Sequence, residues 1–294
     1  MHLFQERDFG EKINATFAYT TQNFRSLLPA LLYIAGPVAL LAGIAEGVFQ
    51  SELLTGQSPF GSDAPSAGDQ ISILYKGGFS IFFLSNILKI LANLIASLVV
   101  YSHLYLYNRN ASVFIDAGVI WPEIVSALGR SLWITFVSFW LALLGFVFII
   151  IPGIYIGVVL SLALPVTVFE KSGLSRTISR CFQLISDKWW STFGLLVIMA
   201  LIVLVLGFGF SIPAALVNIL TALKILPNTP AIVTVLVSAI STVGVTLLSA
   251  LVALAIGFQY FNLVERQEGT GLLSAIDTIG TSFTRPTAQD EGDY

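Results

Sequence analysis

Lys89 is the residue best placed for chemistry in this chain, because it lies inside the apolar segment 79–101. A charged side chain within a membrane-spanning helix is costly, and it usually faces a partner or a water-filled cavity. Asn86 and Asn93 lie three residues before it and four residues after it, on the same face of a helix. Glu46, in the apolar segment 28–49, is the acid that can pair with Lys89.

Two roles fit these four residues. In the first, they form an interhelical hydrogen-bond seam in which Lys89 and Glu46 neutralise each other. In the second, they line an intramembrane polar cavity, and the two charges couple to the movement of a proton, an ion or a substrate. We expect the seam and keep the cavity as the alternative.

The sequence lacks the residue combinations that most catalytic sites need. The chain has two histidines, His2 and His103, and a single cysteine, Cys181, which are too few for a zinc or haem site. It has no Gly-x-x-x-x-Gly-Lys-Ser/Thr phosphate loop and no Gly-x-Ser-x-Gly nucleophile elbow. We therefore expect no enzyme activity, no catalytic residue and no cofactor. His103 lies beside three tyrosines, and we expect it to be an interface anchor.

The composition predicts an all-α polytopic membrane protein. Of 294 residues, 56% are hydrophobic and only 11% are charged, whereas a soluble domain carries about 25% charged residues. A membrane-spanning helix needs about 20 mostly apolar residues, and the chain has several such segments. The net charge of −3 and the absence of a basic stripe exclude nucleic acid as a partner. Membrane lipids are the partners that the composition itself implies.

Six spans are predicted, at residues 28–49, 79–101, 132–151, 153–169, 192–212 and 232–259. Residues 1–27 form a cytoplasmic amphipathic segment, residues 28–264 the membrane domain, and residues 265–294 a cytoplasmic tail that is partly disordered. Eleven Lys and Arg residues flank the side that holds both termini, and two lie in the opposite loops. This imbalance predicts that both termini are cytoplasmic.

The segment 131–169 contains no charged residue. As a single straight helix it would be about 58 Å long, against about 30 Å for the hydrocarbon core. Because proline lacks an amide donor and glycine permits a reversal, Pro152-Gly153 is the expected turn of a helical hairpin. Pro165 is expected to bend the second helix of that hairpin.

Two segments on the predicted cytoplasmic side are amphipathic. Segment 174–190 has apolar residues at helical spacing, and it carries Arg176, Arg180 and Lys188, which either contact lipid headgroups or only fix the topology. The N-terminal segment has the same pattern, and an offset of 165 residues aligns the two, for instance Ile13 with Ile178. Segment 112–130 fits this pattern loosely. We expect three units, each an interfacial helix followed by a hairpin.

Two glycine pairs predict close helix packing. Gly43 and Gly47 form one small-xxx-small motif, and Gly153 and Gly157 form the other. Such motifs let the backbones of two helices approach each other, although they also arise by chance in apolar sequence.

The segments 151–155 (IPGIY), 163–166 (ALPV), 169–173 (FEKSG), 179–185 (SRCFQLI) and 188–194 (KWWSTFG) together form a recognisable pattern. Over about 45 residues the chain resembles the membrane domain that is fused to some glycerophosphodiester phosphodiesterases, and a wider group of bacterial multi-span membrane proteins. The resemblance implies a bacterial inner-membrane protein. It implies no activity, because the catalytic barrel of that family needs about 250 residues of its own.

Two functional hypotheses follow from the sequence. The first is a non-enzymatic scaffold or accessory subunit that binds another membrane protein. The second is a small transporter or lipid-handling protein that uses the polar residues around Lys89.

Overall fold

The computed structural model describes residues 2–55, 79–109, 115–148, 150–223, 225–226 and 229–269, and every regular element in these ranges is a helix. The helices are α1 (Phe9–Gln22), α2 (Phe24–Ile34), α3 (Gly36–Thr55), α5 (Phe79–Arg109), α6 (Ala117–Phe148), α7 (Ile150–Leu160), α8 (Ala163–Glu170), α9 (Leu174–Ile185), α10 (Trp189–Ala222) and α11 (Ala231–Glu268). Residues 56–78 and 270–294 lie outside the described residues, and the latter hold most of the predicted tail. Lys76 and Lys224, the two basic residues of the loops opposite the termini, also lie outside them.

Five segments of this structure are long and apolar enough to cross a membrane, and the bent pair α2–α3 makes six if it is counted as one span. The α7–α8 segment, residues 150–170, counts as one of the five. The prediction of an all-α polytopic membrane protein is therefore confirmed.

The first predicted span, residues 28–49, lies on two helices with a bend between them. Its two parts, α2 and α3, meet at Ala35 with a bend of 52°. Pro37 explains the break, because it has no N–H to donate to the carbonyl of Tyr33, four residues earlier. Ala39 resumes the helical pattern by donating to the carbonyl of Ala35 at 3.0 Å.

The hairpin of α6 and α7 is present, but the expected turn at Pro152-Gly153 is wrong. Helix α6 ends at Phe148 and α7 begins at Ile150, so both predicted turn residues lie in the first turns of α7. Proline is tolerated there because the first amides of a helix have no intrahelical partner. Gly153 instead permits close packing, since a Cβ at this position would lie 2.6 Å from the backbone nitrogen of Phe146.

The break expected near Pro165 is present. It separates α7 from α8 at residues 161–162, where the chain makes a turn. Pro165 cannot donate to the carbonyl of Ser161, and this missing hydrogen bond favours a break at this point. The α7–α8 segment is thus a span of two short helices.

The offset of 165 residues reappears in the helix boundaries. Helices α1 and α9 begin at Phe9 and Leu174, and helices α2 and α10 begin at Phe24 and Trp189. Segment 112–130 does not form a separate helix in its described part, because α6 runs without interruption from Ala117. The first and third units therefore share one design, and the middle unit departs from it.

Helix α9 differs in detail from the prediction. It ends at Ile185, five residues before the expected end at Trp190. It buries Thr177, Cys181, Leu184 and Ile185 against its neighbours, while Phe182 remains 40% exposed. The predicted apolar stripe therefore lies partly on the inward face of α9, through Ile185, and partly outside it, at Phe182.

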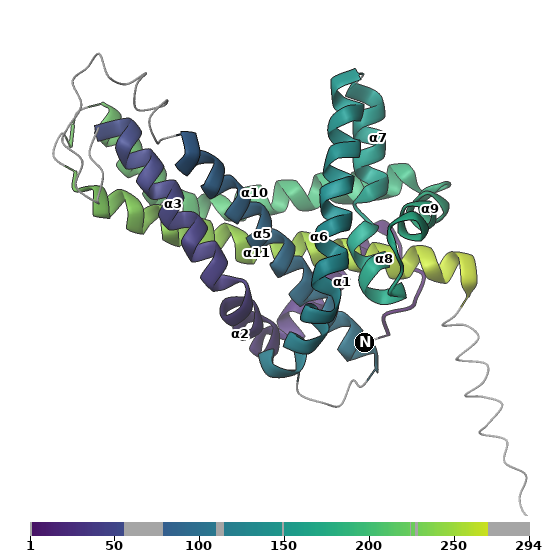
Figure 1. Ribbon diagram of the computed structural model, residues 1–294. Helices are drawn as coiled ribbons and strands as arrows, with labels where there is room; N and C mark the ends of the chain where they lie inside the picture. Colours follow the sequence, from purple (N-terminus) through teal and green to yellow (C-terminus); the bar gives the residue numbers. More distant parts are fainter. Residues whose placement is uncertain are drawn as a thin grey trace, which may run out of the picture.

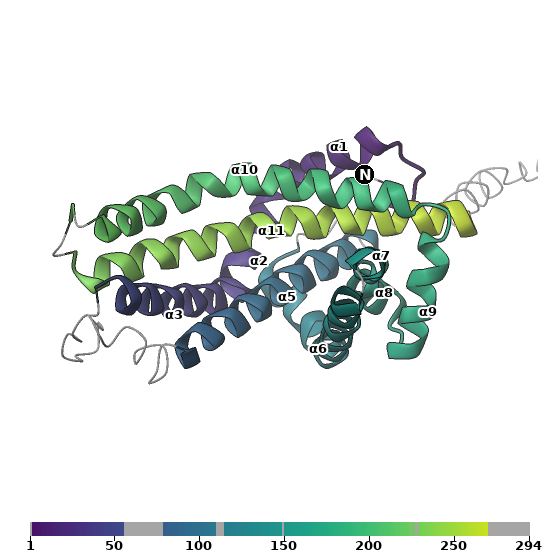
Figure 2. The ribbon, with the colours of Figure 1, turned by 90° about the horizontal axis from the view of Figure 1, so that it is seen from above.

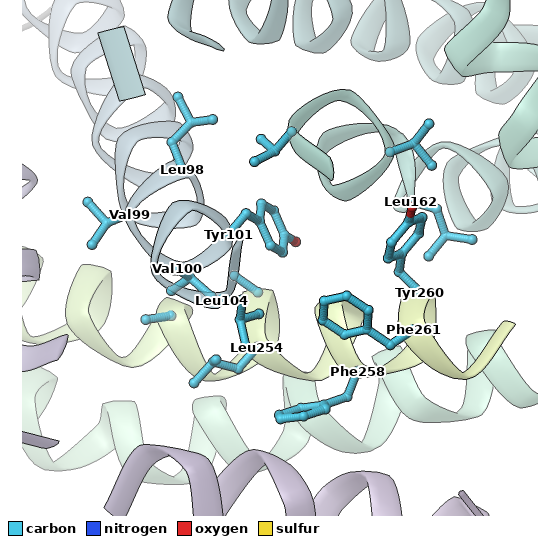
Figure 3. Packing of buried hydrophobic residues seen from close by; sticks show 14 of the residues in the cluster. Leu98, Val99, Val100, Tyr101, Leu104, Leu162, Leu254, Phe258, Tyr260 and Phe261 are labelled. Atoms are coloured by element: carbon cyan, nitrogen blue, oxygen red, sulfur yellow. The ribbon is translucent and has the colours of Figure 1, made fainter. Parts of the chain in front are cut away.

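Most of the helices pack around α11. Helices α10 and α11 run side by side with α1 lying across them, and the α6–α7 hairpin stands apart from the pair α3–α5 (Figures 1 and 2). The main core lies between α5 and the C-terminal half of α11, where Tyr101 and Leu104 of α5 face Leu162 and the α11 residues Phe258 and Phe261 (Figure 3). All five side chains are less than 2% exposed.

The first glycine pair is a packing motif, as expected. A Cβ at Gly43 would lie 2.6 Å from the Cα of Ala239, and a Cβ at Gly47 would lie 2.5 Å from the Cα of Val235. Helices α3 and α11 therefore touch backbone to backbone at both positions. In the second pair only Gly153 is closely packed, because a Cβ at Gly157 would meet nothing within 4 Å.

Candidate functional site

Lys89 and Glu46 form an ion pair between α5 and α3. The Lys89 Nζ lies 2.8 Å from the Glu46 Oε2, and the two side chains are 32% and 17% exposed. The same Oε2 accepts a hydrogen bond from Ser85 at 3.1 Å, and Oε1 accepts one from Gln50 at 2.8 Å. Three donors from two helices therefore hold the Glu46 carboxylate.

Gln50 extends this pair into a network across four helices. Its Oε1 accepts hydrogen bonds from the Asn218 amide of α10 at 2.7 Å and from the Ser238 hydroxyl of α11 at 3.1 Å. The Oδ1 of Asn218 is buried and has no hydrogen-bond partner. Sequence reasoning did not assign these three residues to the site. The position of Gln50, one helical turn after Glu46, was the available signal.

Asn86 and Asn93 do not join the network. Asn86 donates to the carbonyl of Phe82 at 2.8 Å, and Asn93 donates to the carbonyl of Lys89 at 2.9 Å. Each amide thus bonds to its own helix one turn earlier. Of the four residues predicted to form one site, only Lys89 and Glu46 contact each other through their side chains in the described structure.

A groove between α6 and the α7–α8 segment is a second candidate site. It has a volume of about 270 Å³. Its lining residues are mostly small or hydroxyl-bearing: Ile134, Thr135, Ser138, Phe139, Ala142, Gly157, Leu160, Ser161, Ala163 and Leu164. The sequence interpretation missed this groove, because it depends on the angle at which the two helices diverge.

Three hydroxyl groups on one face of α6 have no partner. The oxygens of Ser131, Thr135 and Ser138 are buried and make no hydrogen bond, and the last two residues line the groove. Ser and Thr hydroxyls in helices commonly bond to a carbonyl one turn earlier, and an unpaired polar group in a membrane is costly. The spacing of these residues at i, i+4 and i+7 was the signal in the sequence. These hydroxyls therefore have hydrogen-bonding capacity that the chain itself does not use, and two of them belong to residues that line the groove.

The α6 helix has little cover from the rest of the chain. Only 11% of its most apolar stretch is buried within the protein, against 39% for α5. Trp133, Phe136 and Trp140 are each about half exposed, and their rings contact one another along the helix. This hairpin presents its apolar surface to lipid or to another membrane protein.

The predicted headgroup cations are in different environments. Arg180 forms ion pairs with Glu170, at 3.0 Å, and with Glu268. Burial lowers the pKa of Arg180, but the two carboxylates outweigh burial, and the net effect is a raised pKa. Arg176 and Lys188 make no ion pair within 4 Å to a carboxylate in the described ranges.

His103 is buried, so the expectation of an interface anchor was wrong. Its Nδ1 lies 2.6 Å from the Tyr19 hydroxyl of α1, and its Nε2 lies 2.9 Å from the Ser26 hydroxyl of α2. Burial, followed by the nearby Tyr107, raises the pKa of Tyr19. The imidazole joins α5 to the two N-terminal helices, so its role in the fold is structural.

Within the described ranges, no group of three or more His, Cys, Asp or Glu side chains is placed to hold a metal ion. The fold and these two polar sites define an all-α integral membrane protein with a hydrogen-bonded seam and a separate groove. No protein-family model, curated protein or solved structure matches this chain.

Proposed function

We propose that this protein is a non-enzymatic scaffold or accessory subunit of a complex in the bacterial inner membrane, with both termini in the cytoplasm. The observation that carries the proposal is the groove between α6 and α7–α8. Its small residues and its unpartnered hydroxyls at Thr135 and Ser138 suit a transmembrane helix of another protein. Small residues let helix backbones approach, and Ser and Thr form hydrogen bonds across helix interfaces in membranes.

The polar seam supports the same proposal. Lys89 and Glu46 neutralise each other, and Gln50 and Ser85 complete the hydrogen bonding of the carboxylate. A charge pair held in this way stabilises the packing of α3 on α5. The resemblance to the membrane domain of glycerophosphodiester phosphodiesterases is also compatible with a membrane module that acts through other proteins.

Purification from native membranes in mild detergent, followed by mass spectrometry, tests the proposal. We expect a membrane protein to co-purify in stoichiometric amount with the wild type. The Gly157→Leu variant fills the groove and should lose this partner. Gly209→Leu is the matched control, because Gly209 is an exposed glycine of spanning helix α10 whose Cβ would meet nothing within 4 Å.

A wild-type protein that is reproducibly solitary would count against the scaffold. Retention of the partner in Gly157→Leu would show that the groove is not the binding surface. These two outcomes test the function and its location separately.

The alternative is a lipid-handling protein or small transporter. The groove is also the observation that favours this function, because about 270 Å³ holds part of an acyl chain, and an ester carbonyl is an acceptor that suits the unpartnered hydroxyls of Thr135 and Ser138. Native mass spectrometry separates the two functions. A bound phospholipid that Gly157→Leu displaces, without any protein partner, supports lipid handling.

A further inference from the structure

Lys12 is a buried cation without a counter-ion. It lies in α1, is 4% exposed, and makes no ion pair within 4 Å in the described part of the chain. Its Nζ has one hydrogen-bond contact, to the Ser191 hydroxyl at the start of α10, at 3.4 Å. An ammonium group has three donors, so this contact leaves most of its hydrogen-bonding capacity unused.

The packing of α1 forces Lys12 into this position. Phe9 and Ile13, on either side of it in the sequence, pack against a cluster that includes Leu195 and Met199 of α10. The ring of Phe9 also lies beside Gly194 of α10, where a Cβ would be 3.4 Å from its Cε2. The apolar stripe of α1 therefore fixes the helix on α10 and α11, and Lys12 is carried inward with it.

Other positive charges gather around Lys12. Burial is the main cause that lowers the pKa of Lys12 to about 8, followed by the charges of Arg266 and Lys188, while Asp8 acts in the opposite direction. Lys188 is the residue immediately before α10, and Arg266 lies in the last turn of α11. Three cations from three elements thus lie close enough for the charges of Lys188 and Arg266 to act on Lys12.

One further feature of this region suits an anion. The first amides of α10 point out of its N-terminus without intrahelical partners, and the helix dipole favours negative charge there. Lys12 reaches this end of α10, because its Nζ contacts the Ser191 hydroxyl in the first turn of the helix.

We propose that Lys12, Lys188 and Arg266 form a binding site for a phosphate group, between α1, the N-terminus of α10 and the C-terminal end of α11. The bound anion supplies the counter-ion that Lys12 does not have within 4 Å in the described part of the chain. Trp189 and Trp190 lie at the same end of α10, and Trp190 is 77% exposed, as suits the headgroup level of a membrane. The phosphate belongs either to the headgroup of an anionic lipid or to a soluble phosphate ester.

Thermal unfolding of the full-length protein, followed by tryptophan fluorescence, tests the site in two arms. In the soluble arm, delipidated protein in detergent receives inorganic phosphate, with sodium chloride at equal ionic strength as the reference. In the lipid arm, phosphatidylcholine nanodiscs with and without phosphatidylglycerol are compared. We expect the Tm to rise by about 5 °C in at least one arm. A rise with phosphatidylglycerol alone assigns a lipid headgroup, and a rise with inorganic phosphate assigns a soluble ligand.

Lys12→Met tests the buried cation, and Arg266→Gln tests the cluster at an exposed position that tolerates substitution. Both variants should lose most of the Tm rise. Arg25→Gln is the matched control, because Arg25 is an exposed cation of neighbouring helix α2, and it should keep the full rise. If Lys12→Met does not fold, Lys188→Gln takes its place. The absence of a Tm rise in both arms, or an equal rise in the wild type and in these variants, overturns the proposal.

Discussion

Replacing Glu46 with glutamine removes the negative charge that faces Lys89 in the seam. The side-chain amide keeps the volume of the carboxylate and its hydrogen bonding to Gln50, so the loss is mainly electrostatic. The Lys89 ammonium then remains in its place between α3 and α5, without the carboxylate that lies 2.8 Å away in the wild type.

The expected cost lies between two limits. Exposed ion pairs contribute about 0–1 kcal/mol, and breaking a fully buried pair costs about 3–5 kcal/mol. Lys89 and Glu46 are 32% and 17% exposed, which places the pair between these limits. We expect Glu46→Gln to reduce the free energy of unfolding by about 2 kcal/mol. For a chain of this size the Tm falls by about 5 °C.

A double-mutant cycle isolates the interaction. The variants are Glu46→Gln, Lys89→Met and the combination of both, and the free energy of unfolding is measured in mixed detergent micelles by tryptophan fluorescence. Because the double variant has no unpaired charge, it should be more stable than the sum of the single effects by about 1–2 kcal/mol. Glu52→Gln is the matched control, since Glu52 lies on α3 outside the ion pairs within 4 Å of the described chain.

Additive single effects would refute the reasoning. If the coupling energy is below about 0.5 kcal/mol, the two charges do not stabilise each other in the membrane. A loss of stability in Glu52→Gln equal to that in Glu46→Gln would show that the effect is general to acids of α3.

Three further predictions concern packing, charge and hydrogen bonding. Gly43→Val should reduce the free energy of unfolding by about 2–3 kcal/mol, because its Cβ would lie 2.6 Å from the backbone of α11. Gly157→Ala should be nearly neutral, because a Cβ there would meet nothing within 4 Å. Equal Tm values for the two variants would contradict this prediction. The folded-state pKa of Lys12 is lowered to about 8 from 10.5, so between these pH values the unfolded chain binds a proton that the folded chain does not, and stability rises with pH. Tm should therefore increase from pH 8 to pH 10 relative to Lys12→Met, and parallel pH profiles would argue against it. His103→Phe should cost about 2 kcal/mol by leaving the buried Tyr19 hydroxyl unpaired, and faster trypsin cleavage in the N-terminal helices would report the loosened contact.

The class of the protein could be predicted from the sequence, because the length of an apolar segment and the charges that flank it can be read without knowing the tertiary contacts. A segment such as 232–259 has the length and hydropathy of a span whatever its neighbours are, and α11 covers it from Ala231 to Glu268. The offset of 165 residues likewise predicted the matching starts of α1 and α9. Turn positions were less certain, since Pro152 fits both a turn and the first turn of a helix.

The seam was partly visible in the sequence. The pairing of Lys89 with Glu46 followed from their rarity inside apolar segments, and the structure contains it. Asn218 and Ser238 could not be assigned to Glu46, because they reach it only through Gln50, across the contacts of α3 with α10 and with α11. A polar residue within a span shows that a partner is needed, but the partner depends on which helices pack together.

By itself, the sequence determined the solvent of this protein: its apolar segments require a membrane, and their lengths set the number of spans. Only the tertiary structure decided where polar groups meet. The burial of Lys12 depends on how α1 lies across α10 and α11, and the groove beside Thr135 depends on the angle between α6 and α7–α8. Both are properties of helix packing, which arises from contacts between residues far apart in the chain and therefore has no local signal.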